Sequence, residues 1–267
     1  MLKIIFTDLD DTLLKENKFE ESLLFNFIEK LLRDNFIIIP VTSKTSPEVL
    51  KVFLKSKLNF SFSVENGAAH YKLTKNKRYT RKVNDNAVKS SKIKKILSKY
   101  INKQYLRQII IIENLNIKEQ MRITRLQENQ IFNFLKREYS VPILWNEGYM
   151  TFIDFKNELK RFNLKASYGG KMFNISGCHN KLDALKYFME FYSNKILYER
   201  VVTISIGDSD NDIDMLNCAE YSGIVKNKSK LLKLEDKKNT FYSSYCAPEG
   251  WLEVVKKIKE QLEKDYI

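Results

Sequence analysis

Two aspartates one residue apart follow a short apolar run near the start of the chain. The run is Ile4 to Phe6, and Asp8 and Asp10 come just after it. Such a run is typical of a buried parallel strand, and open α/β sheets place their ligand sites at the carboxyl ends of these strands. Two carboxylates in one crevice repel each other unless a divalent cation holds them. A turn with helix-capping carboxylates would give the same pattern, so residues further along the chain must decide.

Strand-like and helix-like segments alternate in the first quarter of the chain and again in its last third. Strands are predicted over 36–41, 60–64 and 201–206, with a helix over 181–192 before the last of them. Ser46 is the expected N-cap of a helix after the second strand. This alternation predicts a parallel, Rossmann-like sheet in an α/β fold.

The middle of the chain breaks this rhythm and mixes helices with antiparallel strands. The expected elements are a hairpin or connector over 72–89, helices over 90–100, 117–139 and 154–163, strands over 108–113 and 141–145, and a hairpin over 164–175. We therefore expect a Rossmann-like α/β core built from residues 1–83 and 178–267, and an inserted α+β cap domain over residues 84–177.

The charge and the cysteines exclude some classes of protein. The chain has 267 residues and a formal net charge of +13, but its lysines are mixed with Asn, Ser and Tyr, and no RNA-binding, zinc-finger or helix-turn-helix motif accompanies them. We expect a solvated basic surface that attracts an anionic substrate, with no nucleic acid as partner. Three cysteines without paired spacing favour a reduced, cytoplasmic protein. The apolar runs are too short to span a bilayer, so no membrane partner is expected.

Four further polar residues occur at the ends of predicted strands or at the start of helices. They are Thr42, Lys181, Asp208 and Asp212. Each alone has an ordinary explanation, such as a strand-end hydroxyl, a surface lysine or acids at a helix N-terminus. If they come from adjacent strands of one sheet, they meet the first two aspartates in one crevice. Carboxylates, a hydroxyl and an ammonium are the groups that phosphoryl transfer with Mg²⁺ uses.

This pattern resembles the haloacid dehalogenase superfamily of phosphatases. The segments that carry the resemblance are Asp8-Leu9-Asp10-Asp11-Thr12-Leu13, Thr42, Lys181 and Gly207-Asp208-Ser209-Asp210-Asn211-Asp212. The long insert is similar to the C2-type cap of that superfamily. Within it, the chain resembles the mannosyl-3-phosphoglycerate phosphatase family. That likeness lies in Thr42-Ser43-Lys44-Thr45, Glu65-Asn66-Gly67-Ala68-Ala69, Arg137-Glu138-Tyr139-Ser140-Val141-Pro142, Gly169-Gly170-Lys171-Met172-Phe173 and Pro248-Glu249-Gly250-Trp251.

The resemblance implies roles for individual residues. Asp8 is the expected nucleophile and forms an aspartyl-phosphate, while Asp10 acts as general acid and base. Thr42 and Lys181 are expected to stabilise the transferring phosphoryl group. The implied ligands of Mg²⁺ are Asp8, the backbone carbonyl of Asp10, Asp208 and, in support, Asp212. The implied contacts to a small anionic sugar-glycerate phosphate are Ser43, Lys44, Asn66, Arg137, Glu138 and Lys171.

Three residues depart from the family pattern, and the last two of them leave the identity of the substrate open. Asp11 stands where the family usually has Gly, and Val141 replaces a Glu. Lys171 replaces an Arg, so a side chain that can donate two parallel hydrogen bonds to a carboxylate or phosphate is replaced by a single ammonium charge. We expect Asp11 to point away from the metal as a turn residue. The alternatives are a broader sugar-phosphate phosphatase or phosphomutase of the same superfamily, or a basic nucleic-acid-binding protein with an inactive site.

Overall fold

The protein forms two compact units in a computed structural model. The structure describes residues 1–15, 23–56, 58–146, 149–168, 172–194, 200–227, 232–234 and 237–266. The first unit contains Met1–Thr42, Lys51–Lys82 and Asn180–Ile267, and the second contains Ser43–Leu50 and Val83–His179. The short segment Ser43–Leu50 groups with the inserted residues and not with the core.

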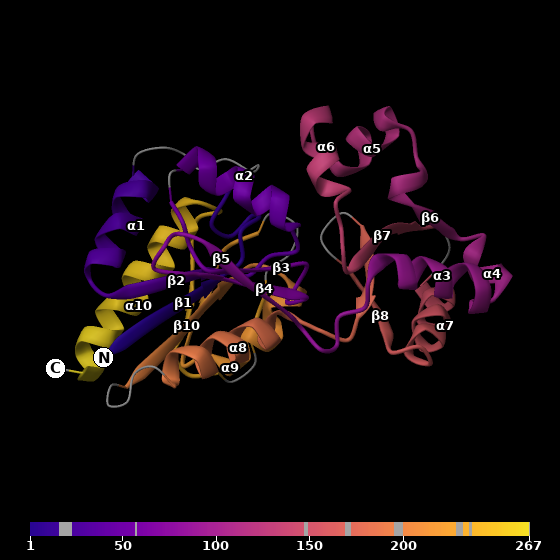
Figure 1. Ribbon diagram of the computed structural model, residues 1–267. Helices are drawn as coiled ribbons and strands as arrows, with labels where there is room; N and C mark the ends of the chain where they lie inside the picture. The colour runs from indigo at the N-terminus through magenta and orange to yellow at the C-terminus, as the bar shows by residue number, and fades with distance from the viewer. Residues whose placement is uncertain are drawn as a thin grey trace. The chain divides into compact units, whose positions relative to one another are not determined.

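A five-stranded parallel sheet forms the centre of the first unit (Figure 1). Its order is β12 (Thr240–Tyr242), β11 (Tyr221–Ile224), β10 (Val201–Gly207), β1 (Leu2–Thr7) and β2 (Phe36–Pro40). All four strand pairs are parallel. The prediction of a parallel, Rossmann-like sheet is therefore confirmed. The sequence did not indicate β12, because two half-buried residues and one exposed residue give no alternation of apolar and polar positions.

Helices cover both faces of this sheet. On one face, α8 (Lys181–Ser193) and α9 (Ile213–Cys218) pack against β1 and β2 through a cluster that includes Phe6, Ile39 and Phe188. On the other face, α10 (Glu249–Tyr266) buries Trp251 completely, edge-on to Phe27 of α1 (Leu23–Arg33). The indole Nε1 donates to Thr7 Oγ1 over 3.0 Å, so α10 is fixed at the carboxyl end of β1.

The connection after β2 is held by a helix cap. Helix α2 (Ser46–Ser56) begins at the predicted N-cap, Ser46, which is one residue earlier than expected, because Thr45 provides the cap instead. The backbone N–H of Thr45 donates to Glu48 Oε2 over 2.8 Å, and Glu48 N donates back to Thr45 Oγ1 over 3.4 Å. This reciprocal pair is a capping box. A short sheet of β3 (Phe62–Val64), β4 (Ala69–Leu73) and β5 (Tyr79–Val83) follows. Its last two strands are neighbours over 69–83, so they overlap only part of the hairpin or connector predicted over 72–89.

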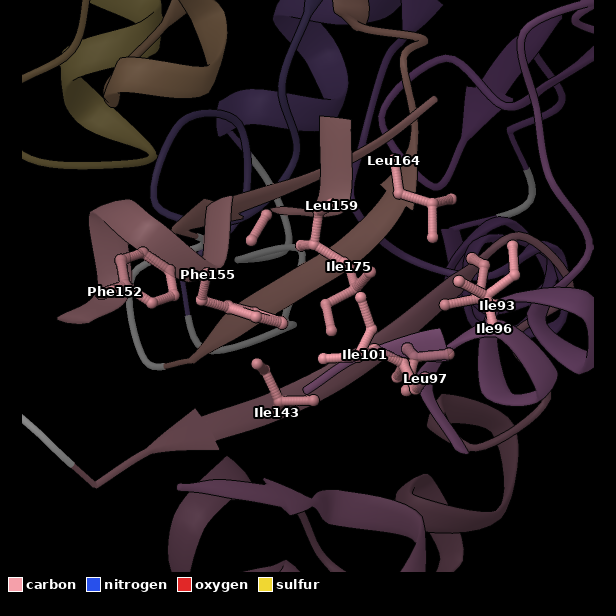
Figure 2. Packing of buried hydrophobic residues seen from close by; sticks show 12 residues of the cluster. Ile93, Ile96, Leu97, Ile101, Ile143, Phe152, Phe155, Leu159, Leu164 and Ile175 are labelled. Carbon is pink, nitrogen blue, oxygen red and sulfur yellow. The ribbon is translucent and has the colours of Figure 1, made fainter. Parts of the chain in front are cut away.

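The second unit is an antiparallel sheet with helices packed on it. Its order is β6 (Ile109–Ile111), β7 (Ser140–Trp145), β9 (Phe173–Gly177) and β8 (Leu164–Tyr168). Apolar side chains of α3 (Ser90–Tyr100) and α7 (Tyr149–Lys160) cover one face, as Figure 2 shows. The remaining helices of this unit are α4 (Lys103–Leu106), the 3₁₀ turn Ile112–Asn114, α5 (Ile117–Thr124) and α6 (Glu128–Phe134).

Two elements of the second unit differ from their predicted extent. Helix α7 begins five residues before the predicted start at residue 154, because Phe152 belongs to the buried cluster and stays in the helix. The predicted strand over 108–113 is only three residues long. Ile112 leaves the strand and begins the 3₁₀ turn, where its side chain is fully buried against Phe134. None of the described helices is both long and apolar enough to cross a bilayer.

Candidate active site

Three of the predicted site residues follow the three central strands of the parallel sheet. Thr7 lies opposite Ile206 on one side and Pro40 on the other. The strands β10, β1 and β2 therefore end side by side, and Asp208, Asp8 and Thr42 follow them. The backbone N–H of Asp8 donates to the carbonyl of Ile206 over 3.0 Å, which extends the pairing one residue beyond the strand. The polar residues thus gather at the carboxyl edge, where parallel sheets place their ligand sites.

A buried lysine connects two of the aspartates. Lys181 Nζ lies 2.9 Å from Asp8 Oδ1 and 2.7 Å from Asp212 Oδ1, and the lysine is fully buried. Burial alone would lower the pKa of Lys181, but the two carboxylates outweigh it and raise that pKa above its usual value. The ammonium therefore stays charged. Lys181 is the first residue of α8, whose N-terminus is capped by Asn180 and Asp183.

Asp212 also fixes the loop that follows β10. Its Oδ2 accepts hydrogen bonds from the backbone N–H groups of Asp208 and Ser209, both over 3.1 Å. Gly207 permits this close approach, since a Cβ at that position would lie 2.5 Å from Asp212 Cγ. Asp212 therefore holds Lys181 with one oxygen and the Asp208 backbone with the other.

Asp208 is held by two side chains for which no role was predicted. Thr12 Oγ1 donates to Asp208 Oδ1 and Asn227 Nδ2 donates to Asp208 Oδ2, each over 2.6 Å. Thr12 belongs to the segment Asp8-Leu9-Asp10-Asp11-Thr12-Leu13, which carries the family resemblance. The sequence therefore contained a signal that could have indicated Thr12 as a site residue. Asn227 follows β11 in a lysine-rich segment of ordinary composition, and only the fold brings it to Asp208. The two donors fix the plane of the carboxylate.

The buried charges suit a hard divalent cation. Asp8, Asp208 and Asp212 offer carboxylate oxygens that all lie within 4.8 Å of one another. Three carboxylates against one ammonium leave an excess of negative charge. Burial and the neighbouring Asp212 carboxylate raise the pKa of Asp208 to about 7. Burial also raises the pKa of Asp8 well above its ordinary value, an effect that Lys181 only partly offsets. Oxygen ligands of this density and charge are those that Mg²⁺ binds, so the residues fit the predicted cofactor.

Asp10 and Asp11 lie on the turn after β1 and face different surroundings. Asp10 is half-buried, and its charge contributes to the raised pKa of Asp8, so the two carboxylates are close neighbours. Asp11 is exposed and has a left-handed backbone, with φ at 56°. A left-handed turn residue explains why glycine is usual in the family at this position, and Asp is one of the few side chains that tolerate it.

The segment after β3 connects the site to its neighbouring loops. Three consecutive residues, Glu65, Asn66 and Gly67, have positive φ values of 47°, 57° and 95°. The backbone N–H of Asn66 donates to the carbonyl of Thr42 over 2.8 Å. A Cβ on Gly67 would lie 2.0 Å from the carbonyl oxygen of Asn180. Only glycine therefore allows this turn to approach the residue that precedes Lys181.

The predicted substrate contacts divide between the two units. Asn66 belongs to the first unit, and its Oδ1 accepts from Asn211 Nδ2 over 3.4 Å. In the second unit, Arg137 Nη1 donates to the carbonyl of Ser43 over 3.1 Å, so these two residues are brought together. Lys44 is buried and Glu138 is exposed. Lys171 lies outside the described residues.

The fold and this site define the class of protein. Residues 5–242 match the family model of the haloacid dehalogenase-like hydrolases, so the chain belongs to that family. It is 29% identical over 237 residues to a mannosyl-3-phosphoglycerate phosphatase from Pyrococcus furiosus, covering 84% of this chain and 91% of that protein. It is 24% identical to a glucosyl-3-phosphoglycerate/mannosyl-3-phosphoglycerate phosphatase from Persephonella marina, with 98% of both chains covered. The predicted class, a phosphoric monoester hydrolase, is confirmed.

Solved structures show the same fold at low sequence identity. A haloacid dehalogenase-like hydrolase from Bacteroides thetaiotaomicron superposes with a TM-score of 0.67 at 14% identity, covering 97% of this chain and all of the other. A haloacid dehalogenase-like hydrolase from B. subtilis gives a TM-score of 0.62 at 18% identity, covering 97% and 99%. The α/β fold class expected from the sequence is thereby confirmed.

Replacing Asn227 should weaken the metal site without removing a ligand. We expect Asn227→Ala to reduce Mg²⁺ affinity by about 10- to 100-fold, because Asp208 loses the donor that orients it. Isothermal titration of the metal-free protein with Mg²⁺ measures this. The control is Asn194→Ala, an exposed asparagine at the end of α8. Equal affinities in the parent and the Asn227 variant would contradict the orienting role.

Replacing Gly67 should disturb Lys181. The added methyl group of Gly67→Ala forces the backbone of Asn180 to move, and a displacement of about 1 Å at a catalytic group can lower kcat by about 100-fold. Phosphate release from p-nitrophenyl phosphate measures kcat, and circular dichroism checks that the fold is retained. A folded variant with the kcat of the parent would show that Lys181 does not depend on this turn.

Asp11→Gly should leave catalysis close to that of the parent. Glycine adopts the left-handed conformation without strain, and the exposed carboxylate is outside the cluster of buried acids. Asp11→Val is the matched variant, because a β-branched residue is disfavoured at positive φ and should lower the melting temperature. Melting curves and kcat/KM for both variants test this. A large loss of activity in the glycine variant would assign Asp11 to the reaction.

Proposed function

We propose that the protein is a Mg²⁺-dependent phosphatase that works through an aspartyl-phosphate on Asp8. The observation that carries this proposal is the way the carboxylate of Asp8 is held. Lys181 Nζ lies 2.9 Å from Oδ1, and the backbone N–H of Leu9 donates to the same oxygen over 2.7 Å. Because both contacts go to Oδ1, Oδ2 is the oxygen oriented for attack on phosphorus.

The reaction has two displacement steps. Asp8 Oδ2 attacks phosphorus, the ester P–O bond breaks, and Asp10 donates its proton to the departing alkoxide. Asp10 then takes a proton from water, the resulting hydroxide attacks phosphorus, and the Asp8–phosphorus bond breaks to release phosphate. Thr42 donates a hydrogen bond to a phosphoryl oxygen, and Lys181 supplies a positive charge beside it.

Mg²⁺ would be held by Asp8, the backbone carbonyl of Asp10 and Asp208. When bound, it neutralises phosphoryl charge and the excess of buried carboxylates. Asp212 serves as a positioning residue in this scheme, because its oxygens already accept from Lys181 and from the backbone after Gly207.

The substrate we propose is mannosyl-3-phosphoglycerate or its glucosyl counterpart, hydrolysed to the glycosylglycerate, a compatible solute. The relatives from Pyrococcus and Persephonella support this, because their names give these substrates and the alignments cover most of the chain. In the proposal the second unit is the cap that selects the substrate, with Ser43, Lys44, Asn66, Arg137, Glu138 and Lys171 as contacts to the glycosylglycerate group. A broader sugar-phosphate phosphatase or a phosphomutase uses the same core residues and differs only in these contacts.

The nucleophile and the substrate can be tested together. We expect Asp8→Asn to abolish phosphate release while keeping the circular dichroism spectrum of the parent, because an amide oxygen cannot form the covalent intermediate. The measurement is inorganic phosphate released with Mg²⁺ from mannosyl- and glucosyl-3-phosphoglycerate, a panel of hexose phosphates and p-nitrophenyl phosphate. Mg²⁺-dependent turnover by the Asp8 variant would refute the mechanism.

The same panel separates the candidate functions. Preference for the two glycosylated phosphoglycerates supports the proposed substrate, and similar turnover of many hexose phosphates would indicate a broad phosphatase. A phosphomutase would rearrange its ester without net release of phosphate. If the parent hydrolyses no ester, a salt-dependent gel shift would support the nucleic-acid-binding alternative.

A further inference from the structure

The peptide that follows the proposed nucleophile lies beyond the hydrogen bonds of the parallel sheet. The preceding peptide is held on both sides. Its N–H, on Asp8, donates to the carbonyl of Ile206 over 3.0 Å. Its carbonyl, on Thr7, accepts from the N–H of Val41 over 2.8 Å. The next peptide joins Asp8 to Leu9, and it makes no backbone–backbone hydrogen bond with any residue that the structure describes. Other contacts must therefore fix its plane.

Side chains provide both hydrogen bonds of that peptide. Its carbonyl, on Asp8, accepts from Thr7 Oγ1 over 2.8 Å. Its N–H, on Leu9, donates to Asp8 Oδ1 over 2.7 Å. The orientation of this one peptide therefore decides where Oδ1 of the carboxylate is held. A carbonyl that accepts a hydrogen bond also polarises its own peptide, which makes the N–H of that peptide a stronger donor.

The indole of Trp251 fixes the hydroxyl of Thr7. Trp251 Nε1 donates to Thr7 Oγ1 over 3.0 Å, and both side chains are fully buried. An indole N–H can only donate, whereas a hydroxyl carries one proton and can also accept. Thr7 Oγ1 therefore accepts from the indole and keeps its single proton for the carbonyl of Asp8. The indole, the hydroxyl, the peptide and the carboxylate form one chain of hydrogen bonds from Trp251 Nε1 to Asp8 Oδ1.

Close packing at the start of α10 gives the indole a fixed position. The ring of Trp251 lies edge-on to Phe27, with the ring centres 6.3 Å apart. At Gly250, a Cβ would lie 2.2 Å from the carbonyl oxygen of Tyr245, so the helix start is in contact with the loop before it. Close packing of this kind leaves a buried side chain little freedom to rotate. Trp251 belongs to the segment Pro248-Glu249-Gly250-Trp251, for which no role was predicted.

From this chain of hydrogen bonds we infer that Trp251 and Thr7 are positioning residues for the nucleophile. They act through the peptide between Asp8 and Leu9, which holds Oδ1 and leaves Oδ2 as the attacking oxygen. Lys181 supplies the other contact to Oδ1, so the carboxylate is held by a charge from α8 and by a neutral chain of hydrogen bonds from α10. This inference rests on the proposed role of Asp8 as the nucleophile.

The test removes the hydroxyl of Thr7. Thr7→Val has nearly the shape of threonine but no hydroxyl. We expect it to lower kcat for p-nitrophenyl phosphate with Mg²⁺ by about 10-fold, because a hydrogen bond that orients the nucleophile is lost. KM should stay that of the parent, since an interaction that matters only in the transition state changes kcat and kcat/KM equally. Thr7→Ser restores a hydroxyl and should recover most of the kcat.

Two comparisons separate positioning from packing. Thr7→Val also leaves the indole N–H without an acceptor and should lower the melting temperature. Phe27→Leu is the control, because it loses the edge-on contact with Trp251 and lowers the melting temperature but should keep the kcat of the parent. Adding Trp251→Phe to Thr7→Val should cause no further loss of kcat, since the indole acts only through the hydroxyl. Losses of kcat that multiply in this double variant, or a fall in kcat in Phe27→Leu as large as in Thr7→Val, would overturn the inference.

The amide of Leu9 reports the same chain of hydrogen bonds without turnover. In protein labelled with isotopic leucine, nuclear magnetic resonance should show the Leu9 amide proton shifted upfield and exchanging faster with solvent in Thr7→Val, because its bond to Asp8 Oδ1 is weaker. Phe27→Leu should keep both properties of the parent. This change in Leu9 supports the inference even if the parent hydrolyses no ester, which would refute only the proposed function. A Leu9 amide that is the same in the parent and in Thr7→Val refutes the inference itself.

Discussion

The contact on which the site depends is the buried ammonium of Lys181 between Asp8 and Asp212. A fully buried lysine is tolerated only when charged partners compensate for its lost hydration. Here the partners come from the ends of β1 and of the loop after β10, so the ion pairs also fix those two chain segments relative to α8. Gly67 and Gly207 provide the space for this arrangement, because a side chain at either position would overlap Asn180 or Asp212. The same contacts therefore determine both the geometry of the site and the local packing around it.

The buried carboxylates of Asp8 and Asp208 are in an electrostatically unfavourable environment. Burial raises the pKa of Asp8 and of Asp208, so both carboxylates would bind protons more readily than in water. A divalent cation held by these oxygens would offset that penalty and favour the ionised form of Asp8, as the proposed mechanism requires. Thr12 and Asn227 keep Asp208 oriented by donating to both of its oxygens. In the proposed function, the cluster therefore reduces the stability of the protein at the place where binding of a metal ion would recover it.

The second unit also contains buried polar atoms that have no partner among the described residues. Its sheet is a conventional apolar core on one face, where Phe155 and Leu159 are fully buried. On the other face, Asn174 and Arg137 each leave a buried polar atom without a partner in the described part of the chain. Packing explains the first face, although the Trp145 Nε1 donor beside that cluster also has no partner among the described residues.

The sequence by itself determined the parallel sheet and the order in which Asp8, Thr42, Lys181 and Asp208 occur along it, because apolar runs that end in polar residues are a local signal. It also indicated that Asp11 is a turn residue, as its positive φ agrees. Only the tertiary structure decided that Asn227 and Thr12 hold Asp208, that Asp212 is bonded to Lys181 and the backbone, and that Asn174 has an unpaired acceptor. Those contacts join residues up to 196 positions apart, and no local pattern encodes a partner at that separation.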